Sequence, residues 1–314
     1  MSSGLLKSPL PYLALFVAHL IWGANFVIAK LTLWEFPVMS LAFLRFFLAF
    51  ILLVPFLLVF SKKDLKVKIE HWPKLFGAAI LMVTLNIAFF FEGISRTSAI
   101  SASSLTMSIP IFSVLIAWIF LREKIYFVNF LGVLFGLLGA MVILGLPLIF
   151  LGSYSSTELT GNLFILLSSL SSVVGIIFAK QLLKTYHPII LSTIFFGIAS
   201  LSFLFPAILE YVQNPAWINK VSVLGVLGLF YMALMSSVVA YFLLSWAIEK
   251  VDIVQASMFE YINPAVTATL AVPILGERIS FSFIIGTCLV ILGVYWGTLG
   301  KSEHHHIHHK HHRI

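Results

Sequence analysis

The sequence predicts an all-α integral membrane protein whose ten transmembrane helices form two inverted five-helix repeats. Three observations carry this prediction. The chain is strongly apolar, its apolar residues fall into ten continuous stretches, and the second half repeats motifs of the first half in the same order. The expected parts are a cytoplasmic N-terminus at 1–10, repeats at 11–151 and 159–300, and a histidine-rich cytoplasmic tail at 301–314.

The composition excludes an ordinary water-soluble domain. Hydrophobic residues make up 61% of the 314 residues and charged residues only 10%, whereas soluble domains carry about 25% charged residues. Lipid tails accept apolar side chains on every face of a helix. The formal net charge of +7 would suggest nucleic acid as a partner of a soluble protein. Here the basic residues lie in short loops between apolar stretches, so we expect no nucleic acid partner.

Ten apolar stretches are each long enough to cross a bilayer. About 20 apolar residues span the hydrocarbon core, and these stretches lack the alternation of membrane β-barrel strands. Helix breakers and charges separate them, as at 34–37 (WEFP) and at 187–188 (HP). The expected spans are 11–29, 37–60, 75–94, 100–121, 127–151, 161–183, 189–209, 221–247, 253–275 and 281–299.

Lysine and arginine are distributed unequally between the two sides of these spans. With the N-terminus inside, fourteen of the 19 basic residues lie on the inner side, four lie on the outer side, and Arg45 lies within a span. Positively charged loops are retained in the cytoplasm. The sequence therefore predicts a multi-pass protein of the cell (inner) membrane with both termini cytoplasmic.

The second half of the chain repeats short motifs of the first half at offsets of 150, 151 and 154 residues. Residues 26–30 (FVIAK) match 176–180 (IIFAK), and residues 121–125 (LREKI) match 275–279 (LGERI). Because five is an odd number, a repeat of five spans lies upside down relative to its twin. Inverted repeats are typical of alternating-access transporters, whose substrate site lies near the membrane midplane between the halves.

Several motifs resemble those of the EamA family in the drug/metabolite transporter superfamily. They are residues 22–26 (WGANF) followed by Lys30, 44–46 (LRF), 97–99 (TSA), 121–123 (LRE) and 275–278 (LGER). The resemblance covers about residues 12–300. It implies ten helices in two inverted halves around a central cavity, and the export or exchange of small metabolites such as amino acids, their derivatives and amines. The halves differ at two aligned positions, where Phe196 corresponds to Arg45 and Glu260 to Thr106.

Polar, charged and aromatic side chains at membrane depth are the candidate substrate-binding residues. Charged groups there are costly in lipid and usually face a cavity or a partner. The predicted substrate-binding residues are Asn25, Arg45, Asn86, Glu92, Tyr241, Trp246, Glu260 and Asn263.

Two charged candidates also have structural interpretations. Arg45 could bind a substrate carboxylate through its planar fork of donors, or it could bond to backbone carbonyls or to Glu92. Glu92 and Arg96 stand four residues apart and could simply pair at the outer surface.

The amide and aromatic candidates are equally open. Asn25 and Asn86 could orient a ligand or bond neighbouring helices. Tyr241 and Trp246 could form a cavity wall that holds a cation, or they could serve as packing and interface anchors.

Glu260 is the strongest single candidate. It shares one helical face with Asn263, Pro264 and Thr267 at i, i+3, i+4 and i+7 spacing, and the proline leaves the carbonyl one turn earlier without its helical partner. A carboxylate beside a broken helix suits an ammonium group or a coupling proton. The alternative is a structural salt bridge, or a carboxyl kept neutral by burial.

Glycine motifs and the tail have simpler interpretations. Gly132-x-x-x-Gly136 and Gly293-x-x-x-Gly297 predict close helix packing, within the chain or between protomers. The tail at 303–314 could bind Zn²⁺ or Ni²⁺ loosely, but a solvated segment without a role is the default.

The expected function is a secondary transporter, an exporter or exchanger of small polar metabolites such as amino acids or their derivatives. Amines, quaternary ammonium compounds and nucleoside-like metabolites are alternative substrates. The sequence has no Gly-x-x-x-x-Gly-Lys-Ser/Thr motif for phosphates, so exchange, substrate gradients or protons would supply the energy. The other classes are a membrane-embedded enzyme and an assembly or sensor subunit. We expect no enzyme activity, cofactor or metal, and expect lipid and a small-molecule substrate as partners of a monomer or homodimer.

Overall fold

The computed structural model describes residues 9–59, 65–121, 127–143, 155–251 and 256–302. Within these ranges the chain is helical and contains no strand. Eight helical segments among the described residues are long and apolar enough to cross a membrane. The prediction of an all-α multi-pass membrane protein is therefore confirmed.

Helices of the first half follow the first five predicted stretches. They are α1 (Leu10–Thr32), α2 (Val38–Leu53) extended by η1 (Val54–Val59), η2 (Ile69–His71), α3 (Trp72–Ala79), η3 (Ile80–Leu85), α4 (Asn86–Arg96), α5 (Ala99–Leu105), η4 (Thr106–Ser108), α6 (Ile109–Leu121) and α7 (Phe127–Ile143).

Helices of the second half follow the other five stretches. They are α9 (Ser156–Leu182), α10 (Pro188–Gln213), η5 (Pro215–Lys220), α11 (Val223–Tyr231), η6 (Met232–Val239), α12 (Ala240–Ile248), η7 (Met258–Tyr261), α14 (Ile262–Leu275) and α15 (Phe281–Ser302). The helices α7 and α15 are not among the eight membrane-crossing segments, which were found among the described residues alone. α7 is described over 17 residues and α15 over 22 residues.

The helices are interrupted at corresponding places in the two halves. A π-helical segment joins α3 to α4, and another joins α11 to α12. Short 3₁₀ segments lie just before Pro110 and Pro264. Proline cannot donate to the carbonyl four residues earlier, which favours a local change of helical winding. Such π segments are frequent at functional sites, and both of these contribute residues to the cavity described below.

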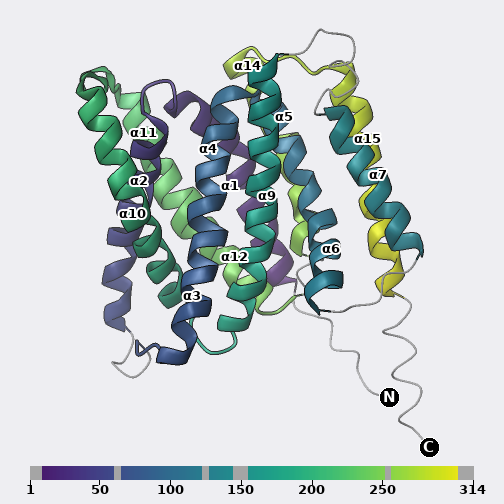
Figure 1. Ribbon diagram of the computed structural model, residues 1–314, viewed down its shortest axis with the longest axis horizontal. Helices are drawn as coiled ribbons and strands as arrows, with labels where there is room; N and C mark the ends of the chain where they lie inside the picture. The colour runs from purple at the N-terminus through teal and green to yellow at the C-terminus, as the bar shows by residue number, and fades with distance from the viewer. Residues whose placement is uncertain (1–8, 60–64, 122–126, 144–154, 252–255, 303–314) are drawn as a thin grey trace, which may run out of the picture.

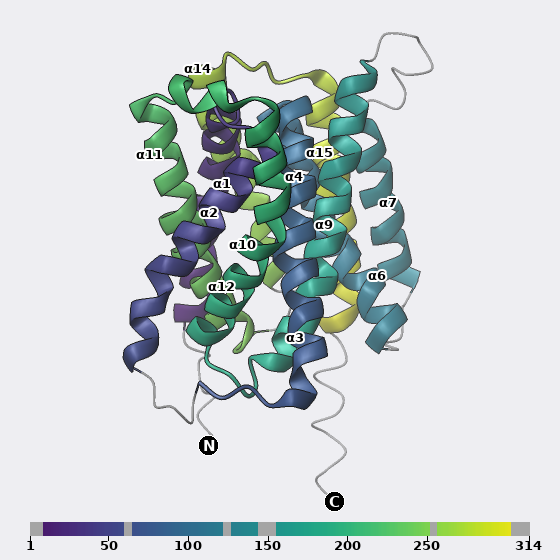
Figure 2. The ribbon, with the colours of Figure 1, turned by 60° about the vertical axis from the view of Figure 1, so that its left-hand side comes forward.

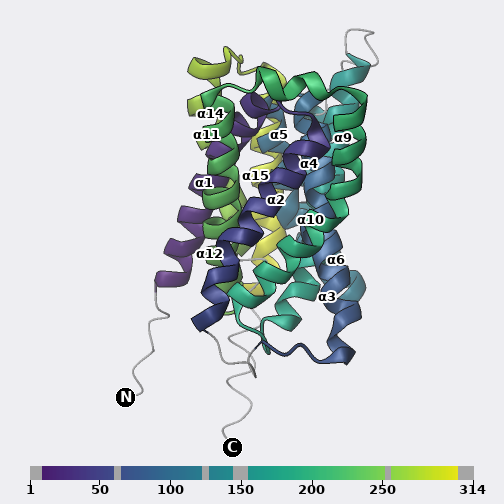
Figure 3. The ribbon, with the colours of Figure 1, turned by 90° about the vertical axis from the view of Figure 1, so that its left-hand side faces the viewer.

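Helices of one half pack chiefly against helices of the other. α1 contacts α12 and α14, α2 contacts α10, and α4 contacts α9. Figure 3 shows α2 and α10 side by side on one face of the bundle. The first turn of α1 and the last turn of α15 lie at the same end of the bundle, the lower end in Figure 2.

α7 and α15 form a pair at one edge of the bundle (Figure 1). Their glycines allow the backbones to touch. A Cβ atom on Gly139 would lie 2.6 Å from the carbonyl oxygen of Gly286, and one on Gly293 would lie 2.5 Å from the backbone nitrogen of Gly136. The glycine motifs therefore pack two helices of one chain together.

Charged side chains bond the free backbone groups at several helix ends. Glu210 on α10 accepts from the backbone N–H groups of Met39 and Ser40 at 3.0 and 2.7 Å, and thereby caps α2 of the other half. The repeat-equivalent lysines cap carbonyl ends within their own halves. Lys30 donates to the carbonyl of Thr97, and Lys180 donates to that of Val251 at 2.8 Å. Cations at helix C-termini are favourable because the free carbonyls carry partial negative charge.

Candidate functional site

A cavity of about 120 Å³ lies inside the bundle and is lined by both halves of the chain. This volume is somewhat below that of a dry cavity of about 150 Å³ that binds benzene. Six of the eight predicted substrate-binding residues line the cavity inside the bundle, namely Asn25, Arg45, Asn86, Tyr241, Glu260 and Asn263.

Arg45 is a buried cation on α2, with only 1% of its surface exposed. Its Nε donates to Ser237 Oγ at 2.8 Å and its Nη2 to Ser236 Oγ at 3.0 Å, whereas Nη1 has no hydrogen-bond partner. The guanidinium carbon lies 5.2 Å from the ring centroid of Phe46 and 5.8 Å from that of Phe91. No acidic side chain among the described residues forms an ion pair with Arg45.

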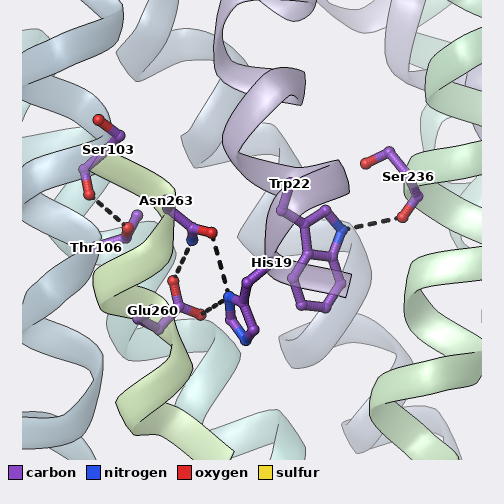
Figure 4. Close-up of polar contacts among 7 residues, drawn as sticks. All are labelled: His19, Trp22, Ser103, Thr106, Ser236, Glu260 and Asn263. Carbon is purple, nitrogen blue, oxygen red and sulfur yellow. Dashed lines mark hydrogen bonds and ion pairs between the residues drawn. The ribbon is translucent and has the colours of Figure 1, made fainter. Parts of the chain in front are cut away.

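Glu260, on η7, belongs to a polar cluster with Asn263 of α14 and His19 of α1 (Figure 4). Its Oε2 accepts from Asn263 Nδ2 at 2.6 Å, and its Oε1 lies 3.9 Å from Nδ1 of His19. The same His19 nitrogen is 3.2 Å from Asn263 Oδ1. One turn further along α14, Thr267 Oγ1 donates to the carbonyl of Gly23 at 2.8 Å. The helical face predicted from the sequence therefore packs against α1.

Trp22 contacts both a residue near Arg45 and a residue near Glu260. Its Nε1 donates to the carbonyl of Ser236 at 3.0 Å, as Figure 4 shows. Its ring meets His19 edge-on at a centroid distance of 5.3 Å and meets Tyr241 edge-on at 5.5 Å. The cavity wall thus contains the guanidinium of Arg45 and the carboxyl of Glu260. The Trp22 ring lies between Ser236, which bonds Arg45, and His19, which lies next to Glu260.

The two asparagines have different environments. Asn86 Nδ2 donates to the carbonyl and the hydroxyl of Ser168 at 3.0 and 2.9 Å, which joins α4 to α9. Asn25 is 4% exposed, and its Oδ1 has no hydrogen-bond partner. This side-chain oxygen is therefore a buried acceptor without a donor in a residue that lines the cavity.

The structure does not bring Glu92 and Trp246 to the cavity. Glu92 pairs with Arg96 at the end of α4, as the i, i+4 alternative proposed. The Trp246 ring lies under Lys250, whose Nζ is 4.4 Å from the ring centroid. The histidine-rich tail at 303–314 lies outside the described residues.

Sequence reasoning did not select three side chains of the cavity wall, His19, Ser236 and Thr106, nor Ser237, which bonds Arg45. A lone histidine in an apolar span and a Ser-Ser pair in another were visible signals, but they are 200 and more residues apart in sequence. Only the packing of α1 and α2 against the second half brings them to one site. The segments η4 and η7, which carry the aligned residues Thr106 and Glu260, also contact each other.

Comparisons with known proteins identify relatives along nearly the whole chain. The family model described as the EamA-like transporter family matches residues 9–145 and again residues 159–298. An uncharacterized transporter of Archaeoglobus fulgidus is 30% identical over 295 residues, which cover 93% of this chain and 98% of that protein. The uncharacterized transporter YoaV of Bacillus subtilis is 24% identical over 90% of this chain and 95% of its own.

A plant protein and a solved structure are also similar. Protein WALLS ARE THIN 1 of Arabidopsis thaliana is 28% identical over 82% of this chain and 74% of its own. The crystal structure of another protein superposes with a TM-score of 0.64 at 17% identity, covering 92% of this chain and 96% of the other. At this identity the structural likeness supports the fold alone.

Proposed function

The chain belongs to the EamA-like transporter family, and we propose that this membrane transporter exports or exchanges small polar metabolites such as amino acids or their derivatives. The proposed route is alternating access across the cell (inner) membrane, with the cavity between the halves as the substrate site. Exchange, substrate gradients or protons would drive it.

The observation that carries the substrate class is the pair of charged side chains in the cavity wall. Arg45 is buried with a free Nη1 and no counterion among the described residues, and a buried charge without a partner is costly. A substrate carboxylate would supply the missing partner. Glu260 would receive an ammonium group, and apolar side chains such as Phe26, Phe90 and Leu244 would contact the rest of the substrate.

The proposed architecture is ten membrane crossings in two inverted repeats, at 11–151 and 159–300, with both termini cytoplasmic. Helices α7 and α15 would supply the two crossings beyond the eight segments found among the described residues. The matched helix interruptions and the matched contacts of Lys30 and Lys180 support the repeat. An even number of crossings agrees with the first turn of α1 and the last turn of α15 lying at one end (Figure 2).

A second candidate substrate is an amine without a carboxylate. Glu260 and the aromatic rings of Trp22 and Tyr241 favour it, because a carboxylate and ring faces attract a cation. Arg45 would then lack a partner in the occupied cavity as well, which makes the amine the weaker candidate.

Counterflow in proteoliposomes tests the proposal. The purified protein would be reconstituted with one unlabelled compound inside, and uptake of the same radiolabelled compound would be followed for a panel of L-amino acids, amines and nucleosides. We expect saturable counterflow of at least one small zwitterion and slower counterflow of the matching amine. Counterflow that requires no carboxylate would favour the amine, and no counterflow of any compound would contradict the proposed function.

A further inference from the structure

His19 is a buried titratable group that the proposed substrate contacts leave without a role. It lies on α1 with 1% of its surface exposed, and it lines the cavity. Its Nδ1 is 3.2 Å from Asn263 Oδ1 and 3.9 Å from Glu260 Oε1 (Figure 4). These three side chains come from two helices, α1 and α14, and from the 3₁₀ segment η7.

The hydrogen bonds of Asn263 determine which His19 nitrogen carries a proton. Asn263 donates its Nδ2 hydrogen to Glu260 Oε2 at 2.6 Å, so its carbonyl oxygen faces His19. A carbonyl oxygen only accepts hydrogen bonds, and with the Asn263 amide in this orientation His19 Nδ1 carries the hydrogen. In a neutral imidazole the other nitrogen, Nε2, is then unprotonated and can accept a proton.

The net charge of His19 and Glu260 depends on how many exchangeable protons the two side chains hold. With neutral His19 and ionised Glu260 the net charge is −1. One added proton, on Glu260 or on His19 Nε2, makes it zero, and a second proton makes it +1. A net charge buried at membrane depth is unfavourable, so the state with one exchangeable proton is preferred.

The other charged groups around the cluster bond elsewhere, and Arg45 keeps a positive charge that the proposed substrate carboxylate would compensate. The cationic Arg45 bonds to Ser236 and Ser237, and Glu249 pairs with Lys250 at the end of α12. α5, η4 and α6 contain no ionisable side chain. The remaining titratable groups on the elements packed against the cluster are Tyr12 and Lys30 on α1, Glu92 and Arg96 on α4, Tyr231 on α11, Tyr241 on α12 and Tyr261 on η7.

We propose that His19, Asn263 and Glu260 form one proton-binding unit that releases a single proton when a cationic group of the substrate binds beside Glu260. The inference rests on the proposed function and names its coupling ion. The substrate ammonium replaces the proton as the compensating charge. The proton leaves Glu260 or His19 Nε2 for water in the cavity, no covalent bond of the substrate changes, and the charge of the site is conserved. Asn263 is a positioning residue, because it fixes the His19 tautomer and the Glu260 carboxyl.

The first experiment measures proton coupling with L-serine as the probe. For each variant in proteoliposomes, the rate of uptake driven by a pH gradient is divided by the rate of counterflow at equal pH. Glutamine retains hydrogen bonding but does not titrate. We expect His19→Gln and Glu260→Gln each to lower this ratio about tenfold or more, and the double variant to lower it no further, since residues that act as one unit are not additive.

His71→Gln is the matched control for that experiment, because His71 lies outside the cavity and contacts Tyr186 at the helix ends. Its ratio should equal that of the wild type. An unchanged ratio in His19→Gln would overturn the proposal, as would independent, additive losses in the two single variants.

The second experiment needs no transport. Dicyclohexylcarbodiimide reacts with protonated carboxyl groups in apolar surroundings, and mass spectrometry of the full chain in nanodiscs would measure its addition to Glu260 over a pH series. We expect His19→Gln to displace the midpoint of labelling by about one pH unit or more. An identical midpoint, or no labelling of Glu260 at any pH, would overturn the proton-binding unit. A displaced midpoint without counterflow of any compound would instead contradict the proposed function.

Discussion

The carboxylate of Glu277 accepts the backbone N–H of Ala99 at 2.7 Å, and this contact joins the second half of the chain to the first residue of α5. The other carboxylate oxygen accepts the N–H of Ile100 at 2.9 Å. Free N–H groups at a helix N-terminus carry partial positive charge and favour an anion. The motif at 275–278 therefore has a structural role as an inter-half cap.

Glu277→Ala should destabilise the folded protein by about 1–2 kcal/mol, because it leaves two backbone donors of α5 without partners. Thermal unfolding of the purified protein in detergent would measure the change. Glu249→Ala is the control, since Glu249 is exposed and bonds only its neighbour Lys250 at 3.3 Å. Equal unfolding temperatures for the two variants would contradict the capping role.

Gly139→Leu should separate α7 from α15. A Cβ at this position would lie 2.6 Å from the carbonyl oxygen of Gly286, so the backbones must move apart. Overpacking costs about 1–3 kcal/mol or more, and we expect a lower unfolding temperature in detergent. Gly77→Leu provides the comparison because nothing lies within 4 Å of a Cβ built there. If both variants unfolded at the wild-type temperature, the packing of this helix pair would be incorrectly assigned.

Hydropathy was sufficient to locate the helices, because every apolar stretch is occupied by helix in the described residues. The i, i+4 spacing also indicated the pair Glu92–Arg96. Contacts between helices could not be predicted in this way. A helix surrounded by lipid is apolar on all faces, so its sequence gives little signal of which face is buried. The bonds of Arg45 to Ser236 and Ser237 depend on that orientation, and on the π segment that carries the serines.

Arg45→Lys should reduce counterflow of a zwitterion about tenfold, because lysine keeps the charge but loses the fork that holds both serines and presents Nη1. Counterflow of the corresponding amine, which has no carboxylate, should change much less. Arg96→Lys, at the end of α4 and outside the cavity, is the matched control. Equal losses for zwitterion and amine would show that Arg45 acts through the structure and not through a substrate carboxylate.

The proposed orientation can be read from single cysteines in a Cys288→Ser background. Lys66→Cys should react with a membrane-impermeant maleimide only from the cytoplasmic side. Lys220→Cys, also at an exposed position, should react from the outside. Labelling of Lys66→Cys in intact cells would invert the topology and with it the assignment of both termini.

Blocking the cavity is the most direct measurement of the central claim, that the substrate passes between the two halves. Ser172 lines the cavity, whereas Ser202 lies outside it and bonds the carbonyl of Ile198 on its own helix at 2.8 Å. Each would be replaced by cysteine in the Cys288→Ser background and modified with a bulky methanethiosulfonate in proteoliposomes. The account predicts that complete modification of Ser172→Cys abolishes counterflow while Ser202→Cys keeps it. Full counterflow by a completely modified Ser172→Cys protein would contradict the account.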